Sequence, residues 1–303
     1  MDISFIIVNW NTKDLLQGCL NSIIITSEAL TYEIIVVDNA SSDGSTAMLA
    51  AKYPQVKTIA NKENRGFGAA NNQGFAVMQG QYALLVNTDA VLTPGAVKKM
   101  WTFAEANPRA AIVCGQLLNA DGSRQNSVAA FPTLLTLAAN TSLLEYLFPR
   151  KYPSKRYEHT GPLEVDSAIG ACMMIRKKAL DEVSFFDERY FFFFEETDMA
   201  YAMRQAGWLV YQVPDALIYH LQGQSIGRRA QSRIEFYRSR YQFLRKWHGR
   251  AYYRAAAAVI FLRLLMNALL SSVGVLFTLG LAEGLRKKLG VYFRIIQWHF
   301  CSR

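Results

Sequence analysis

The triplet Asn87-Thr88-Asp89 holds side chains suited to a divalent cation. It follows an apolar run, Tyr82 to Val86, with the length and composition of a strand buried on both faces of a parallel sheet. Residues two apart in an extended chain point the same way, so Asn87 and Asp89 can address one ligand. Their oxygens suit Mg²⁺ or Mn²⁺ held together with the phosphates of a substrate. The alternative is that Asp89 caps the turn before Pro94.

A second group of acids, Glu195-Glu196-Thr197-Asp198, follows four successive phenylalanines. Four adjacent rings cannot all face one core, so we expect some of them to wall a cleft and exclude water. A carboxylate beside such rings is desolvated, which makes it a better base at neutral pH. The alternative is structural, because acids in the first turn of a helix also complement its dipole.

The elements that would position these acids alternate between strand and helix. Helical segments separate four predicted strands, which span residues 3–9, 32–37, 56–60 and 82–86. This alternation predicts a parallel, doubly wound α/β sheet with right-handed crossovers. The carboxyl ends of its strands carry polar loops, and such ends are where these sheets bind ligands. A further strand is expected at residues 110–118, and two short ones at 210–213 and 216–219.

Composition excludes several classes of protein. The chain has 303 residues, of which 51% are hydrophobic, so it is neither disordered nor fibrous. Its four cysteines lie far apart without CxxC spacing, which argues against a zinc site or a disulfide framework and favours a reducing compartment. We also expect no signal peptide, because the chain enters a strand within three residues. The glycines of Gly66-Phe67-Gly68 follow the wrong strand for a nicotinamide-binding fingerprint.

Four loop motifs carry a resemblance to a known family. In this order and spacing, the motifs VNWN, VVDNASSDGS, NRGFGAANNQG and VNTDA resemble the nucleotide-sugar half of the inverting family-2 glycosyltransferases. The likeness is greatest to the rhamnosyltransferase-like members that build bacterial surface polysaccharide, and it extends to about Gly249. It implies a GT-A fold at residues 1–228, with a nucleotide-sugar half at 1–118 and an acceptor half at 119–228.

The resemblance also assigns the donor site. It implies that Asp38 hydrogen-bonds the nucleobase or ribose, with Val8, Asn9 and Arg65 beside the nucleotide. Asp89 would hold the metal that bridges the diphosphate. The family often has Asp at both ends of this acidic motif, whereas this chain has Asn87 at the first. An amide oxygen still ligates, but the less anionic site is expected to bind metal more weakly. Asp38 and Asp43 have a structural alternative as caps of turns or helices.

The family's acid-acid-x-acid motif implies that Glu196 is the catalytic base, in preference to Glu195. Many relatives have Asp at this position. This chain departs from them with Glu, whose longer side chain changes how far the carboxylate reaches. Asp198 is expected to be structural or to bind the acceptor. His220 matches a strand-end histidine that ligates metal in the family, although a lone histidine is usually structural. Arg228, or Arg229 beside it, would close on the diphosphate.

The C-terminal region, residues 229–303, contains both basic and apolar segments. Arg233 to Trp247 interleaves aromatic and basic residues, which also suits nucleic acid. However, the nineteen residues from Leu264 to Ala282 carry no charge and have basic residues on both sides. Both ends would prefer the cytoplasm, so we expect helices that lie in or dip into the cytoplasmic leaflet of the plasma membrane, and no nucleic acid partner. The alternative is a helical pair buried in a homo-oligomer.

The sequence therefore predicts an inverting glycosyltransferase that uses Mg²⁺ or Mn²⁺. Its donor would be a dTDP- or UDP-linked sugar, rhamnose among the candidates, and its acceptor a lipid-linked glycan. Two alternatives remain open: a nucleotide-binding membrane scaffold without catalysis, suggested by Asn87 and Glu196 where Asp is usual, and a nucleotidyltransferase.

Overall fold

The computed structural model describes residues 1–26, 30–221, 229–279 and 281–301. The chain forms two compact units. Residues 1–131 and 145–225 make up the first unit, and residues 132–144 and 226–303 make up the second.

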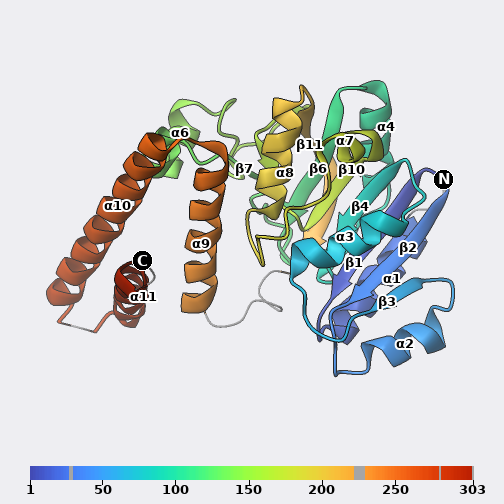
Figure 1. Cartoon of the computed structure of the whole chain (residues 1–303), viewed down its shortest axis with the longest axis horizontal. Coiled ribbons are helices and arrows are strands. Elements are labelled where there is room, and N and C mark those ends of the chain that lie inside the picture. The colour runs from blue at the N-terminus through green and yellow to red at the C-terminus, as the bar shows by residue number, and fades with distance from the viewer. Residues whose placement is uncertain (27–29, 222–228, 280, 302–303) are drawn as a thin grey trace. The chain divides into compact units, whose positions relative to one another are not determined.

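The first part of the first unit confirms the predicted alternation. Its strands and helices follow one another as β1 (Ile3–Asn9), α1 (Lys13–Thr26), β2 (Tyr32–Asp38), α2 (Ser45–Lys52), β3 (Lys57–Ala60), α3 (Phe67–Val77) and β4 (Tyr82–Val86). The strands lie in the order β3-β2-β1-β4, and all three pairings are parallel (Figure 1). Asn9 pairs with Asp38 in this register, so the polar loops after β1 and β2 start side by side.

Most of the later strands join the same sheet, whereas those at residues 128–129 and 167–168 pair with each other in a separate two-stranded sheet. The next elements are β5 (Ala90–Leu92), α4 (Ala96–Ala106), β6 (Ala110–Leu118), β7 (Val128–Ala129), α6 (Thr141–Leu147), β8 (Leu163–Glu164), β9 (Ser167–Ala168), β10 (Cys172–Arg176), α7 (Lys177–Val183), α8 (Glu195–Gln205) and β11 (Leu209–His220). Strand β10 runs antiparallel between β4 and β6, and β11 follows β6 in parallel. Where the sequence predicted two short strands, β11 is continuous; its register against β6 shifts between Gln212 and Leu217, around Pro214.

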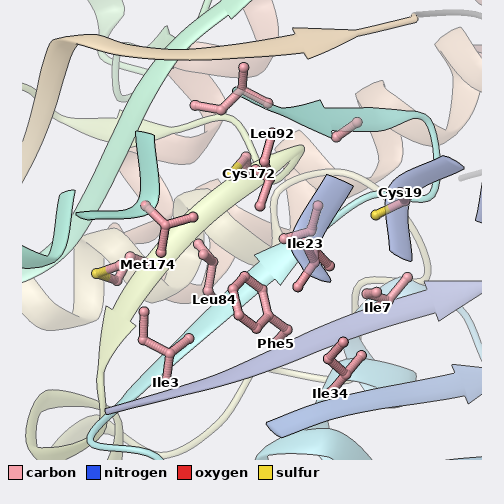
Figure 2. Packing of buried hydrophobic residues seen from close by; sticks show 14 of the residues in the cluster. Ile3, Phe5, Ile7, Cys19, Ile23, Ile34, Leu84, Leu92, Cys172 and Met174 are labelled. Carbon is pink, nitrogen blue, oxygen red and sulfur yellow. The ribbon is translucent and has the colours of Figure 1, made fainter. Parts of the chain in front are cut away.

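Helices cover both faces of the sheet, as a doubly wound fold requires. Side chains alternate along the strands: Phe5 and Ile7 of β1 pack with α1, α2 and α4, whereas Ile6 packs with α3, α7 and α8. Figure 2 shows the first of these cores, in which Cys172 and Met174 of β10 join Phe5 and Leu84. The predicted fold class is therefore confirmed, as a mixed sheet in which β10 and β5 are antiparallel.

The second unit is helical. It contains α5 (Leu134–Ala138), α9 (Arg229–Trp247), α10 (Arg250–Phe277) and α11 (Glu283–Cys301). Its core is built on a stripe of α10, from Ala256 through Ile260 and Leu264 to Ala268, which packs with residues of the other three helices. The uncharged stretch 264–282 does not form one helix, because α10 ends at Phe277 and α11 begins at Glu283. Among the described residues, α10 alone is long and apolar enough to cross a membrane.

Candidate active site

Asp89 and His220, 131 positions apart, lie side by side at the edge of the sheet. Strand β5 pairs antiparallel with the end of β11, which sets His220 opposite Ala90, and the Leu221 N–H donates to the Asp89 carbonyl (2.9 Å). The imidazole Nε2 is 3.3 Å from Asp89 Oδ1, and both side chains are buried. The backbone ladder therefore brings together the two residues that the sequence predicts as metal ligands.

The pair fits a divalent cation by its chemistry. His220 Nδ1 lies 3.0 Å from the amide oxygen of Gln125, to which it donates; in the neutral ring, Nε2 is then an acceptor that faces a carboxylate oxygen. Two acceptors that face each other need a positive charge between them, either a proton or a metal ion. Imidazole and carboxylate together suit Mn²⁺. Within the described part of the chain no three His, Cys, Asp or Glu residues gather as a metal site, so substrate phosphates and water would have to complete the coordination.

The loops after β1 and β2 form one buried polar network. Asn9 Nδ2 donates to Asp38 Oδ1 at 2.7 Å and to Ser41 Oγ at 3.0 Å, while the Ser41 N–H donates to Asp38 Oδ2. Asn9 Oδ1 also accepts from the Thr12 hydroxyl, whose oxygen lies within hydrogen-bond distance (2.9 Å) of the Thr88 hydroxyl. The network thus links the predicted nucleotide residues to the triplet that contains Asp89. Asp38 is 1% exposed and organises this loop; its contact with a nucleotide stays a prediction.

The other predicted donor residues have varied surroundings. Val8 is half-buried against the second core, and Arg65 is exposed in the loop before α3. Asn87 is half-buried, and its N–H donates to the Ala171 carbonyl at 2.9 Å. Arg228 lies outside the described residues.

Glu195 and Glu196, at the start of α8, each have one carboxyl oxygen that is buried and unsatisfied. Phe193 and Phe194, just before the helix, both have positive φ (69° and 75°), which is uncommon for bulky residues and costs about 1–3 kcal/mol each. Directly after these two residues, Glu195 is 3% exposed and Glu196 is half-buried. Backbone strain and unpaired polar atoms together are typical of a functional site.

Burial changes the acidity of both groups. Burial raises the pKa of the Glu195 carboxyl well above its ordinary value, and the charge of Glu196 beside it raises that pKa further. Burial also raises the pKa of Glu196, although hydrogen bonds from its own N–H and from that of Gly170 partly oppose the rise. A carboxylate with a raised pKa is a stronger base, which is what deprotonation of a hydroxyl requires.

Glycines connect the acids to the donor loops. A Cβ on Gly170 would lie 3.8 Å from Glu196 Oε1, and the next residue, Ala171, accepts the Asn87 N–H. Gly66 has a φ of 84°, and a Cβ there would lie 2.6 Å from the Phe191 carbonyl oxygen. The loop after β3 therefore packs directly on the phenylalanine run, and the metal pair, nucleotide loops and acids share one rim of the first unit.

Two other acids accept hydrogen bonds within the fold. Asp43 accepts from the N–H groups of Lys13 and Ser45, at the first residues of α1 and α2, as the capping alternative predicted. Asp198 is buried and accepts from the Tyr190 hydroxyl at 3.0 Å.

Sequence reasoning missed Gln125 and the pair of Thr12 with Thr88. Gln125 is separated from His220 by 95 residues and belongs to no motif, so only the folded structure reveals their contact. Thr12 had a local signal, since it opens the helix directly after the VNWN motif.

Solved structures share this fold. A mannosyltransferase from Pyrobaculum calidifontis in complex with GDP-Man and Mn²⁺ has a TM-score of 0.61 at 16% identity, over 97% of this chain and 84% of that one. GalNAc-T7, solved with UDP, GalNAc and Mn²⁺, has a TM-score of 0.63 at 15% identity, over 98% of this chain and 55% of that one. At these identities the likeness shows the GT-A fold.

Relatives in sequence are glycosyltransferases too. The N-acetylglucosaminyl-diphospho-decaprenol L-rhamnosyltransferase of Mycobacterium tuberculosis is 29% identical over 232 residues, which cover 71% of this chain and 75% of the relative. The low-salt glycan biosynthesis hexosyltransferase Agl10 of Haloferax volcanii is 25% identical over 67% of this chain and 62% of the relative. The family model for glycosyl transferase family 2 matches residues 4–184, more than half of the sequence. The chain therefore belongs to glycosyl transferase family 2.

Proposed function

We propose that this glycosyltransferase is an inverting, metal-dependent enzyme. It transfers a sugar from a nucleoside diphosphate to a hydroxyl of a lipid-linked glycan at the cytoplasmic face of the plasma membrane. Residues 1–228 carry the chemistry, and residues 229–303 attach the enzyme to the membrane.

The observation that carries the proposal is the approach of Asp89 to His220. The two side chains come from the ends of different strands, and they face each other at 3.3 Å in a buried position. Buried polar groups normally have complementary partners. A cation that also binds a diphosphate explains the pair, since both the nucleotide loops and the acids of α8 border the same rim.

The chain's own residues then have distinct tasks. Asp89 and His220 would hold the cation, which when bound would supply positive charge to the departing diphosphate. Asn9 and Asp38 shape the nucleotide loop, and Arg65 contributes positive charge beside it. Glu196 accepts the proton of the acceptor hydroxyl while that oxygen bonds to the anomeric carbon. The carbon–oxygen bond to the nucleoside diphosphate breaks on the opposite face, so the sugar's configuration inverts.

Relatives support the choice of substrates. The name of the mycobacterial relative specifies L-rhamnose as the sugar and N-acetylglucosamine on a decaprenol diphosphate as the acceptor. We propose a dTDP- or UDP-linked sugar, with dTDP-rhamnose tested first, and a glycan on a polyprenyl diphosphate.

A donor screen tests this assignment. Purified enzyme is mixed with nucleotide sugars, with and without Mn²⁺, and thermal stabilisation is measured. We expect one donor to stabilise the protein only with the metal, and then to transfer its sugar to the lipid-linked acceptor. Binding without turnover under any metal would favour a scaffold, and release of pyrophosphate would favour a nucleotidyltransferase.

The second unit offers an apolar surface for the membrane. The face of α10 opposite its buried stripe exposes Leu262, Leu265, Met266, Leu269, Leu270 and Val273. At the turn into α11, four apolar side chains are 73–87% exposed: Leu276, Phe277, Leu279 and Leu281. Exposed basic residues follow at once, Arg286, Lys287 and Lys288. An apolar edge beside basic charge complements an anionic lipid surface.

Vesicle flotation tests the membrane surface. We expect the protein to float with phosphatidylglycerol vesicles more than with phosphatidylcholine vesicles, and the variant L276S/F277S/L281S to lose this binding. The control I25S removes an equally exposed side chain from α1 of the first unit. If the triple variant instead converts a dimer to a monomer in sedimentation and floats unchanged, the surface joins two copies of the chain.

A further inference from the structure

The side chain of Gln125 contacts both the ring and the backbone carbonyl of His220. It is 3% exposed and belongs to the segment that follows the turn at 119–122. Its amide makes three contacts: Oε1 lies 3.0 Å from His220 Nδ1, and Nε2 donates to the carbonyls of His220 (2.5 Å) and Leu118 (3.3 Å).

These contacts fix which way the amide points. If the amide were flipped, its oxygen would face two carbonyl oxygens, and its NH₂ group would face the imidazole. The network therefore assigns Oε1 to His220 Nδ1, which makes Nδ1 a donor. Nε2, the other ring nitrogen, is left to face Asp89.

The position demands an amide and no other group of this size. A carboxylate could accept from Nδ1 but could not donate to the two carbonyls, and an apolar side chain could do neither. The backbone of Gln125 is also held, since its N–H donates to the Leu117 carbonyl and its carbonyl accepts from Gln116 Nε2. The strand ladder fixes the backbone of His220, whereas the hydrogen bond to Gln125 acts on the ring itself, at the nitrogen that does not face Asp89.

From this geometry we infer that Gln125 is a positioning residue for the cation site: it holds the His220 ring so that the Nε2 lone pair and Asp89 Oδ1 converge on one point. The inference rests on the metal site of the proposed function. Partners behind a ligating histidine normally change metal affinity about 10–100-fold when they are removed.

Mn²⁺ binding measures this role without any sugar transfer. The free Mn²⁺ signal is followed by electron paramagnetic resonance as protein is added, alone and with UDP or dTDP. We expect Q125L to weaken binding about 10–100-fold, and Q125E, which keeps an acceptor for Nδ1, to weaken it less. H220A gives the lower limit.

The matched control is Q212L. Gln212 is also 3% exposed and donates to Gln116 Oε1, but it does not contact His220. Circular dichroism and thermal unfolding check that each variant folds, and Q125E tests the idea if Q125L does not fold. Equal Mn²⁺ affinity in Q125L and wild type, or equal losses in Q125L and Q212L, would overturn the role of Gln125 alone. Absence of Mn²⁺ binding by the wild type, even with nucleotide, would overturn the metal site itself.

Discussion

The rim of the first unit has two ends that differ in how their polar atoms are satisfied. At the metal end, Asp89 and His220 face each other, and Gln125 supports the histidine from behind. At the acid end, Glu195 and Glu196 each bury an oxygen without a partner, and burial raises the pKa of both. Under the proposed function, the first end is already arranged to bind the donor, whereas the acceptor hydroxyl would supply the missing partner at the second.

The difference assigns different kinds of work to the two ends. A pair that is already in position does not have to rearrange when a cation and a diphosphate bind. This favours binding of the donor. An unpaired, desolvated carboxylate is costly to the folded protein but reactive toward a hydroxyl. The two ends are thus expected to fail differently when they are mutated.

Asp89→Ala should have the largest effect. Metal neutralisation of a leaving group is worth several kcal/mol, so transfer should fall roughly 10³-fold or more, and Mn²⁺-dependent donor binding should be lost with it. Calorimetry with donor and Mn²⁺ measures the binding. The control D121A removes an exposed aspartate whose carboxylate accepts from Ser123. If D89A bound the donor as tightly as the wild type does, Asp89 would not hold a metal that the donor needs.

Glu196→Gln should separate the two ends. Loss of a general base costs about 10²–10⁴-fold in rate, while the metal end stays intact and donor affinity should be unchanged. In the wild type, transfer should rise with pH through the raised pKa of Glu196, because the ionised form is the active one. Glu195→Gln is the matched control and should keep transfer. If E195Q loses transfer and E196Q does not, the neighbouring acid is the base.

Gly66→Ala tests the contact that joins the nucleotide loop to the phenylalanine run. Its positive φ and the nearby Phe191 carbonyl leave no room for a methyl group, so unfolding free energy should fall by about 1–3 kcal/mol. Chemical denaturation measures it. Gly95→Ala is the control, since it has a similar φ with open space around it; equal losses in both variants would mean that φ alone, and not the contact, sets the cost.

Glu195→Gln should have the smallest effect, on stability. The folded protein holds a proton on this acid to higher pH than the unfolded chain, whose ordinary value is 4.5, so its contribution to stability falls as pH rises above that value. The variant cannot ionise. Its melting temperature should match the wild type below pH 4.5 and exceed it by a few degrees at pH 8, as measured by calorimetry. If the melting temperatures of the two proteins changed with pH in the same way, burial of the charge would be contradicted.

Much of the fold was predictable because its signals are local. The strands at 3–9 and 82–86 are β-branched or apolar runs that end in polar loops, and alternation with helices dictates a parallel arrangement. The antiparallel insertion of β10 was not predictable, since five residues from 172 to 176 carry no mark of their partners. The continuity of β11 through Pro214 was missed because proline normally interrupts a strand.

In the candidate site, as in the fold, some features could be predicted from the sequence and others could not. Asp89, Glu196 and His220 sit in recognisable motifs, so the sequence predicts their types and spacing. Their surroundings do not follow from those motifs: the support from Gln125, the positive φ of Phe193 and Phe194, and the proximity of Gly170 to Glu196. These depend on tertiary packing, which a single sequence does not encode in any local pattern.

The position of β10 has a consequence for engineering. Because this strand lies between β4 and β6, residues 1–118 alone do not form a continuous sheet. A fragment that ends at residue 118 would leave one edge of β4 without its neighbouring strand. Chimeras that exchange donor specificity between relatives would therefore need to carry residues 172–176 along with the transplanted N-terminal segment, or they would leave a gap in the middle of the sheet.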